Sequence, residues 1–186
     1  MTVNDGDLAF SVPTPLITPP APAEVLATLN ERINAARLNM RFVAMLFAVL
    51  DSTARQVIIA NAGNRYPLLM RKGKIEEIPL SGIPLGLMSG TRHEPVSLDV
   101  QPGDTVLFVS DGILECQSSK HEAFGTERLA AVLVSLPSDA SAEEVSSAIL
   151  NGTDVFSSYS CALRDDRSLI VLRVTEESCG DLYAFP

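Results

Sequence analysis

The sequence has few of the residues that build disulfide frameworks and zinc sites. It contains no tryptophan, two histidines and three cysteines. An odd number of cysteines cannot form a complete disulfide framework within one chain, and no pair has Cys-x-x-Cys spacing, so we expect reduced thiols in a cytoplasmic protein. With so few histidines and cysteines, a zinc site of the Cys/His type is not expected.

Positive charge is also scarce. The chain has 14 lysines and arginines against 23 aspartates and glutamates, for a formal net charge of −9. This balance argues against nucleic acid as a ligand, because binding a phosphate backbone requires clustered basic side chains. It is compatible with a phosphorylated protein ligand if a bound cation supplies positive charge locally.

Long apolar runs are absent as well. No stretch approaches the roughly 18 to 20 apolar residues of a membrane-spanning helix, so no membrane span is expected. The first residues do not read as a secretory signal, because Asp5 and Asp7 stand where positive charge is required. A length of 186 residues with 46% hydrophobic residues indicates one globular domain with a substantial core.

The prolines divide the chain. Residues 1–22 are rich in proline, which cannot continue a helix or occupy a central strand, so we expect an extended tail there. Residues 23–174 are expected to form the folded domain, and residues 175–186 a C-terminal tail with no assigned role. Pro22 suits the first position of a helix, and apolar residues at helical spacing predict that helix from residue 23 to about residue 38.

The rest of the pattern predicts a run of strands, then two helices, then a closing strand. The apolar run 42–50 and the branched segment 56–61 predict one hairpin, and residues 66–71 and 74–78 a second, turned at Lys72-Gly73. Further strands are predicted at 96–100, 105–109 and 168–174. Helices are predicted at 127–135 and from 142 to about 150, the latter capped by Ser141. This order indicates the α+β class.

Acidic residues follow one of these strands and precede another. Asp111 leaves the strand 105–109, and Gly112 permits a sharp turn that would present its carboxylate at the rim of the sheet. Taken alone, a plain turn is the better interpretation of this pair. Asp165 and Asp166 precede the last strand and, taken alone, indicate a solvated loop. If both strands share a sheet, the aspartates could converge as oxygen ligands that suit magnesium or manganese better than zinc.

Several short segments within residues 42–174 form an ordered set. They are the strand 42–51 ending in Leu-Asp, Ala60-Asn-Ala-Gly63 followed by Pro67-Leu-Leu69, Gly82-Ile-Pro-Leu-Gly86, Gly103-Asp104, Ser110-Asp-Gly-Ile-Leu-Glu115, Phe124-Gly125 and Asp165-Asp166-x-Ser168. In this order they resemble the landmarks of PPM-type (PP2C-like) phosphatases of the SpoIIE/RsbU branch. Each segment is weak evidence alone, whereas the ordered set is specific.

The resemblance implies an αββα sandwich, in which two antiparallel sheets lie between helical layers. It also implies a serine/threonine phosphatase with a binuclear Mg²⁺ or Mn²⁺ centre, whose metal-activated water attacks the phosphorus. By position, Asp111 and Asp165 would be metal ligands, with Asp166 as the alternative to Asp165. Gly112 would let the ligand approach, and Glu115 would brace the loop. The implied partner is a phosphorylated STAS-type anti-anti-sigma protein.

The sequence departs from the family pattern at its N-terminal end. Two earlier acidic motifs of the family, a Gly-Asp and an Asp-Val-x-Gly-x-Gly, are not visible, so we expect a domain that lacks its first strands. Asn64 stands where the family has a histidine, and we expect it to keep a loop hydrogen bond. Three hypotheses remain open: an active phosphatase, an inactive domain that binds the partner protein, and a fragment of a longer domain.

Overall fold

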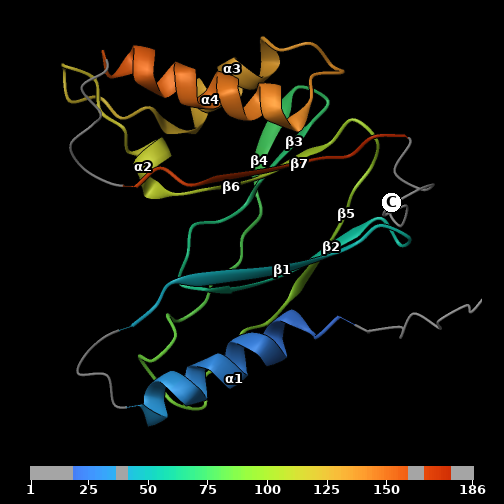
Figure 1. Ribbon diagram of the computed structural model, residues 1–186, viewed down its shortest axis with the longest axis vertical. Helices are drawn as coiled ribbons and strands as arrows, with labels where there is room; N and C mark the ends of the chain where they lie inside the picture. Colours follow the sequence, from blue (N-terminus) through green and yellow to red (C-terminus); the bar gives the residue numbers. More distant parts are fainter. Residues whose placement is uncertain (1–18, 37–41, 159–165, 177–186) are drawn as a thin grey trace, which may run out of the picture.

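The computed structural model describes residues 19–36, 42–158 and 166–176, and these residues form four layers (Figure 1). One helix, α1, covers a three-stranded sheet. A four-stranded sheet packs on the other side, and the helices α3 (Gly125–Val134) and α4 (Ala142–Phe156) cover its outer face. This arrangement confirms the predicted αββα sandwich. No helix in the described ranges is both long and apolar enough to cross a membrane.

The first helix, α1, spans Pro22–Ala35. Pro22 occupies its first turn, where the missing amide hydrogen has no partner to lose. Leu26 and Asn30 are fully buried. Leu26 packs with Ala60, Ala62 and Leu85 against the first sheet, so the apolar stripe read from the sequence is the face that the helix buries.

The first sheet contains β1 (Met45–Asp51), β2 (Gln56–Ala62) and β5 (Val96–Asp99), in the order β1-β2-β5. The predicted first hairpin is confirmed, with Asp51 opposite Gln56 at its turn. Both neighbouring pairs are antiparallel. β1 is therefore an edge strand within the described part of the chain.

The second sheet contains β3 (Leu68–Arg71), β4 (Lys74–Glu77), β6 (Thr105–Val109) and β7 (Leu169–Arg173), all antiparallel in the order β4-β3-β6-β7. Lys72 and Gly73 both have positive φ, 50° and 77°, which is the backbone that a two-residue hairpin of type I′ requires. β6 lies inside the sheet and is largely buried, and among the described residues β7 forms the edge next to it.

In the described residues after β6 the chain forms three helices. α2 (Asp111–Leu114) is a single turn that the sequence did not predict, whereas α3 (Gly125–Val134) lies close to its predicted position. α4 (Ala142–Phe156) begins as predicted but extends six residues past residue 150. Ser141 and Glu144 form a capping box at its start, with Oγ of Ser141 accepting from the Glu144 amide at 3.1 Å.

The core has a separate apolar cluster between each pair of layers. Val57, Ile59 and Val106 meet between the two sheets, and Leu107, Leu129 and Ile149 meet between the second sheet and the helices. These six side chains are each at most 2% exposed, so burying them dominates the stability of the sandwich. Cys116, 3% exposed, also packs into the cluster between the second sheet and the helices.

Candidate active site

The ends of β6 and β7 meet at one rim of the second sheet. The two strands are antiparallel neighbours, with Val109 opposite Leu169, so the exit of β6 lies beside the entry of β7. Ser110 joins them: its amide donates to the Ser168 carbonyl at 3.0 Å, its Oγ donates to the Asp166 carbonyl at 3.0 Å, and that Oγ accepts from the Ser168 amide at 2.8 Å. The structure thus meets the condition set from the sequence, that both strands share a sheet, and it brings the main chain of Asp166 beside Ser110.

Asp111 is the first residue of α2, and its side chain is 55% exposed. Gly112 follows inside the helix and is buried, without the positive φ that six other glycines have. The sharp turn expected at Gly112 is therefore the first turn of a short helix. Asp111 stands at the start of this helix, and its carboxylate lies on the open surface of the rim, as was expected from a turn.

A basic residue that the sequence analysis did not single out binds these acids. Arg65 lies between β2 and β3, and its Nε donates to Oδ1 of Asp111 while its Nη2 donates to Oε1 of Glu115. Asp111 and Glu115 are four residues apart, one helical turn, so both can face one guanidinium. The side chains of Arg65 and Glu115 are 37% and 64% exposed, which makes this a surface ion pair rather than a buried one.

The backbone around Arg65 is fixed by a buried asparagine. Nδ2 of Asn61 donates to the Leu80 carbonyl at 2.6 Å and to the Asn64 carbonyl at 2.8 Å, and its Oδ1 accepts from the Asn64 amide at 2.8 Å. Oδ1 of Asn64 then accepts from the Arg65 amide at 2.8 Å. Asn64 therefore keeps loop hydrogen bonds, as expected for the residue in the family's histidine position.

Gly82 packs against the same asparagine. A Cβ at this position would lie 1.8 Å from the Asn61 carbonyl oxygen, so no larger residue fits without moving backbone. The Asn-Ala-Gly segment and the Gly-x-x-Leu-Gly segment of the sequence are thus packed together. This contact explains why a glycine is needed at that point of the chain.

The acidic pair before β7 is described only in part, since Asp165 lies outside the described residues. Asp166 is exposed and offers its main-chain carbonyl to Ser110. Arg167 ties the loop to the end of α4, where its Nη1 donates to Oγ1 of Thr153 at 2.9 Å and to Oδ1 of Asp154 at 2.7 Å. The loop that carries Asp166 is therefore held from two sides.

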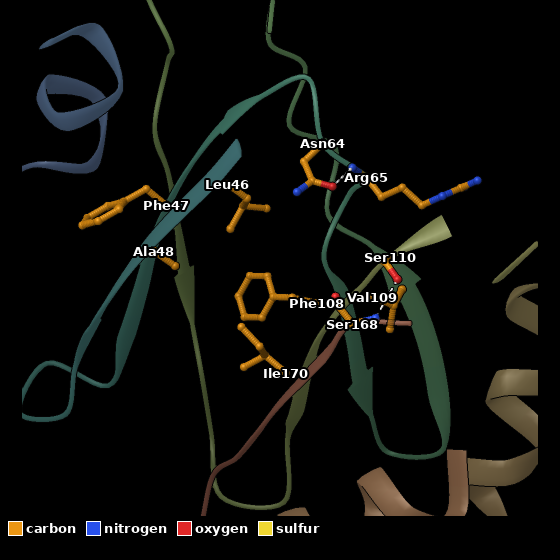
Figure 2. Close-up of a pocket in the computed structure, with 10 residues that line it drawn as sticks. All are labelled: Leu46, Phe47, Ala48, Asn64, Arg65, Phe108, Val109, Ser110, Ser168 and Ile170. Carbon is orange, nitrogen blue, oxygen red and sulfur yellow. Dashed lines mark hydrogen bonds between the residues drawn. The ribbon is translucent and has the colours of Figure 1, made fainter. Parts of the chain in front are cut away.

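A cavity of about 480 Å³ opens beside the rim, between the edge strands β1 and β7 (Figure 2). Leu46, Phe108 and Ile170 give it apolar walls, and Ser110 and Ser168 lie at its polar end. The Arg65 side chain extends away from these apolar groups (Figure 2). Among the residues that the structure describes, no aspartate or glutamate lines this cavity.

The described residues do not form a binuclear metal centre. Within residues 19–36, 42–158 and 166–176, no three histidine, cysteine, aspartate or glutamate side chains lie together as a metal-binding group. Asp111 and Glu115 are instead neutralised in part by Arg65. A hard divalent ion takes about six or more oxygen ligands, so Asp111 and Asp166 could supply only part of such a site.

The two layered sheets with their helices define the class of this protein, which has the fold of PPM-type phosphatase domains. The SiaA-PP2C domain of Pseudomonas aeruginosa superposes with a TM-score of 0.68 at 19% identity, covering 83% of this chain and 60% of that one. The RsbU and RsbW domains of Rv1364c from Mycobacterium tuberculosis give 0.62 at 24% identity, covering 80% and 40%. The phosphatase domain of SpoIIE from Bacillus subtilis gives 0.58 at 16% identity, covering 83% and 73%.

Sequence comparison identifies the family within this class. The family model of Stage II sporulation protein E matches residues 11–175, and the chain belongs to this family. Protein IcfG of Synechocystis sp. (strain ATCC 27184 / PCC 6803 / Kazusa) is 26% identical over 89 residues, which are 47% of this chain. That match spans only 14% of the length of IcfG.

Proposed function

We propose that this chain removes phosphate from a phosphoserine or phosphothreonine of a regulatory partner protein, of the STAS-type anti-anti-sigma kind. Membership of the SpoIIE family supports the reaction class. The observation that carries the proposal is the set of three hydrogen bonds made by Ser110, which place Asp111 and the loop of Asp166 on one rim.

The exposure of the rim suits a protein substrate. The Asp111 side chain is 55% exposed at the end of a sheet rather than at the bottom of a cleft. A phosphorylated side chain on the surface of another protein can therefore reach it without threading into a pocket. The proposed cofactor is Mg²⁺ or Mn²⁺, bound by Asp111 with Asp165 or Asp166, and the remaining ligands would have to come from outside the described residues.

A second candidate is a module that binds the phosphorylated partner without hydrolysing its phosphate. The specific observation in its favour is the pairing of both rim carboxylates with Arg65. The described part of the chain also groups no three metal-ligating side chains. In this case the rim would serve recognition only.

Phosphate release from a phosphoserine peptide and from a phosphorylated STAS protein, measured with Mn²⁺, tests the proposal. We expect release by the wild type and a rate at least about 100-fold lower for Asp111→Ala, the size of effect typical for removing one electrostatic group from an active site. Asp139→Ala is the matched control, because Asp139 is an exposed aspartate in the turn before α4.

The outcomes separate the two candidates. No release by the wild type, with tight binding of the phosphorylated partner, would favour the binding module. Equal release by the wild type and Asp111→Ala would refute the role of the rim. Neither release nor partner binding would count against both candidates.

A further inference from the structure

The positively charged guanidinium of Arg65 lies at the rim. We propose that Arg65 is an internal counter-ion that competes with a divalent metal ion for Asp111, so that guanidinium and metal are alternative partners of the same carboxylate. The inference rests on the proposed function in one respect, because it takes Asp111 to be a metal ligand. It goes beyond that function in assigning to Arg65 the control of metal binding.

The geometry of the ion pair supports competition. Nε of Arg65 donates to Oδ1 of Asp111, so one of the two oxygens that this carboxylate could offer to a metal ion is already occupied. The second donor, Nη2, binds Oε1 of Glu115, so the planar guanidinium spans both carboxylates. A divalent ion on Asp111 would lie next to this positive charge and be repelled by it.

The charge balance points the same way. With Arg65 in place, the three side chains carry a net charge of about −1, and without it the two carboxylates carry about −2. The metal-free rim is therefore stabilised by Arg65, since two unpaired carboxylates on one helical turn repel each other. Arg65 removes that repulsion at the cost of weaker attraction for an external cation.

Exchange requires only a side-chain movement. The Arg65 amide is fixed by Oδ1 of Asn64 at 2.8 Å, and Asn64 is fixed in turn by Asn61. The Arg65 side chain, in contrast, is 37% exposed and points away from Leu46, Phe108 and Ile170 (Figure 2). The guanidinium can thus leave Asp111 while the loop that carries it stays in place.

Titration of the full chain with Mn²⁺, followed by the electron paramagnetic resonance signal of the free ion, tests this directly. The variants are Arg65→Gln, Arg65→Lys and Asp111→Asn, with Arg128→Gln as the control. Arg128 is matched because it forms a comparable surface pair with Glu122, at 3.1 Å and with side chains 46% and 56% exposed.

We expect Arg65→Gln to bind Mn²⁺ about 5-fold more tightly than the wild type, which corresponds to about 1 kcal/mol and is the upper range for an exposed ion pair. Arg65→Lys should be about 2-fold tighter, because it keeps the charge but loses the planar fork. Arg128→Gln should match the wild type, and Asp111→Asn should bind more weakly.

Failure of this inference differs from failure of the proposed function. If Asp111→Asn weakens binding but neither Arg65 variant tightens it, the competition is overturned and the metal-ligand role of Asp111 stands. If Asp111→Asn binds like the wild type, the ligand role fails and the competition fails with it. Should Arg65→Gln not fold, as judged by circular dichroism, the Arg65→Lys result decides alone.

Discussion

Replacing Asp104 with asparagine should destabilise the fold strongly at neutral pH and much less in acid. The Asp104 side chain is 3% exposed in the turn before β6, where it forms an ion pair with Arg71 of β3. Nε of Arg71 donates to Oδ1 at 2.9 Å, Nη2 donates to Oδ2 at 2.6 Å, and the Gln101 amide donates to Oδ2 at 2.7 Å. An asparagine cannot accept all three of these bonds and carries no charge.

The magnitude follows from burial. Breaking a buried ion pair costs about 3 to 5 kcal/mol, but Arg71 is 35% exposed and regains some hydration when its partner is lost. We therefore expect Asp104→Asn to lower the free energy of unfolding by about 2 to 3 kcal/mol at pH 7, as for loss of hydrogen bonds to a charged group. Asp99→Asn, in an exposed aspartate of β5, should change it by less than about 0.5 kcal/mol.

The pH dependence has a definite sign. Burial raises the pKa of Asp104, but the hydrogen bonds from Arg71 and from the Gln101 amide outweigh it, so the pKa of Asp104 lies below its ordinary value of 3.8. A carboxyl group with a lowered pKa in the folded state contributes stability above its ordinary pKa, and loses that contribution as the pH falls through the folded pKa. The difference between wild type and Asp104→Asn should be constant from about pH 7 to pH 5 and shrink below about pH 4.

Urea unfolding at pH 7, 5, 4 and 3 measures this difference. Equal stability of the two proteins at pH 7 would refute the reasoning about the buried pair. A difference that grows as the pH falls would refute the assigned direction of the pKa shift.

Three further changes test other contacts that hold the fold together. Gly82→Ala should cost more than about 3 kcal/mol and lower the midpoint of thermal unfolding, because its methyl group would overlap the Asn61 carbonyl; an unchanged midpoint would contradict this contact. Ser141→Ala should cost about 1 kcal/mol in urea unfolding by removing the cap that binds the Glu144 amide, and no loss would show that the capping box is not formed. Asn30→Leu should cost about 2 kcal/mol or more, because the buried Asn30 amide holds two main-chain groups of the loop at residues 86–88; stability at or above wild type would show that those bonds are not made.

Much of the fold was predictable because its signals are local. Alternating apolar residues, the Lys72-Gly73 turn and the Ser141 cap each specify backbone conformation within a few residues. The four-residue helix α2 was not predictable in this way, since one turn is too short to show a helical period. The far end of α4 was missed because Asn151-Gly152, a pair that typically ends a helix, lies inside this one, where Gly152 packs against Val132 and Phe124.

The candidate site likewise has one part that could be predicted from the sequence and one part that could not. The approach of the Asp111 and Asp166 loops could be predicted, because adjacent antiparallel strands bring the exit of one beside the entry of the other. The pairing of Arg65 with Asp111 could not be predicted, because Arg65 precedes Asp111 by 46 residues. The two residues meet only once Asn61 has fixed the β2–β3 loop. The pairing depends on tertiary structure, and no local pattern distinguishes Arg65 from other surface arginines.

The central claim is that a divalent cation binds at the rim that Ser110 joins. Mn²⁺ broadens the nuclear magnetic resonance signals of nearby amides, so an amide spectrum of the full chain recorded with substoichiometric Mn²⁺ locates the ion. The account predicts selective broadening of the amides of Gly112 and of residues 166–168, abolished by Asp111→Asn. Broadening centred elsewhere, or broadening at the rim that persists in Asp111→Asn, would contradict it.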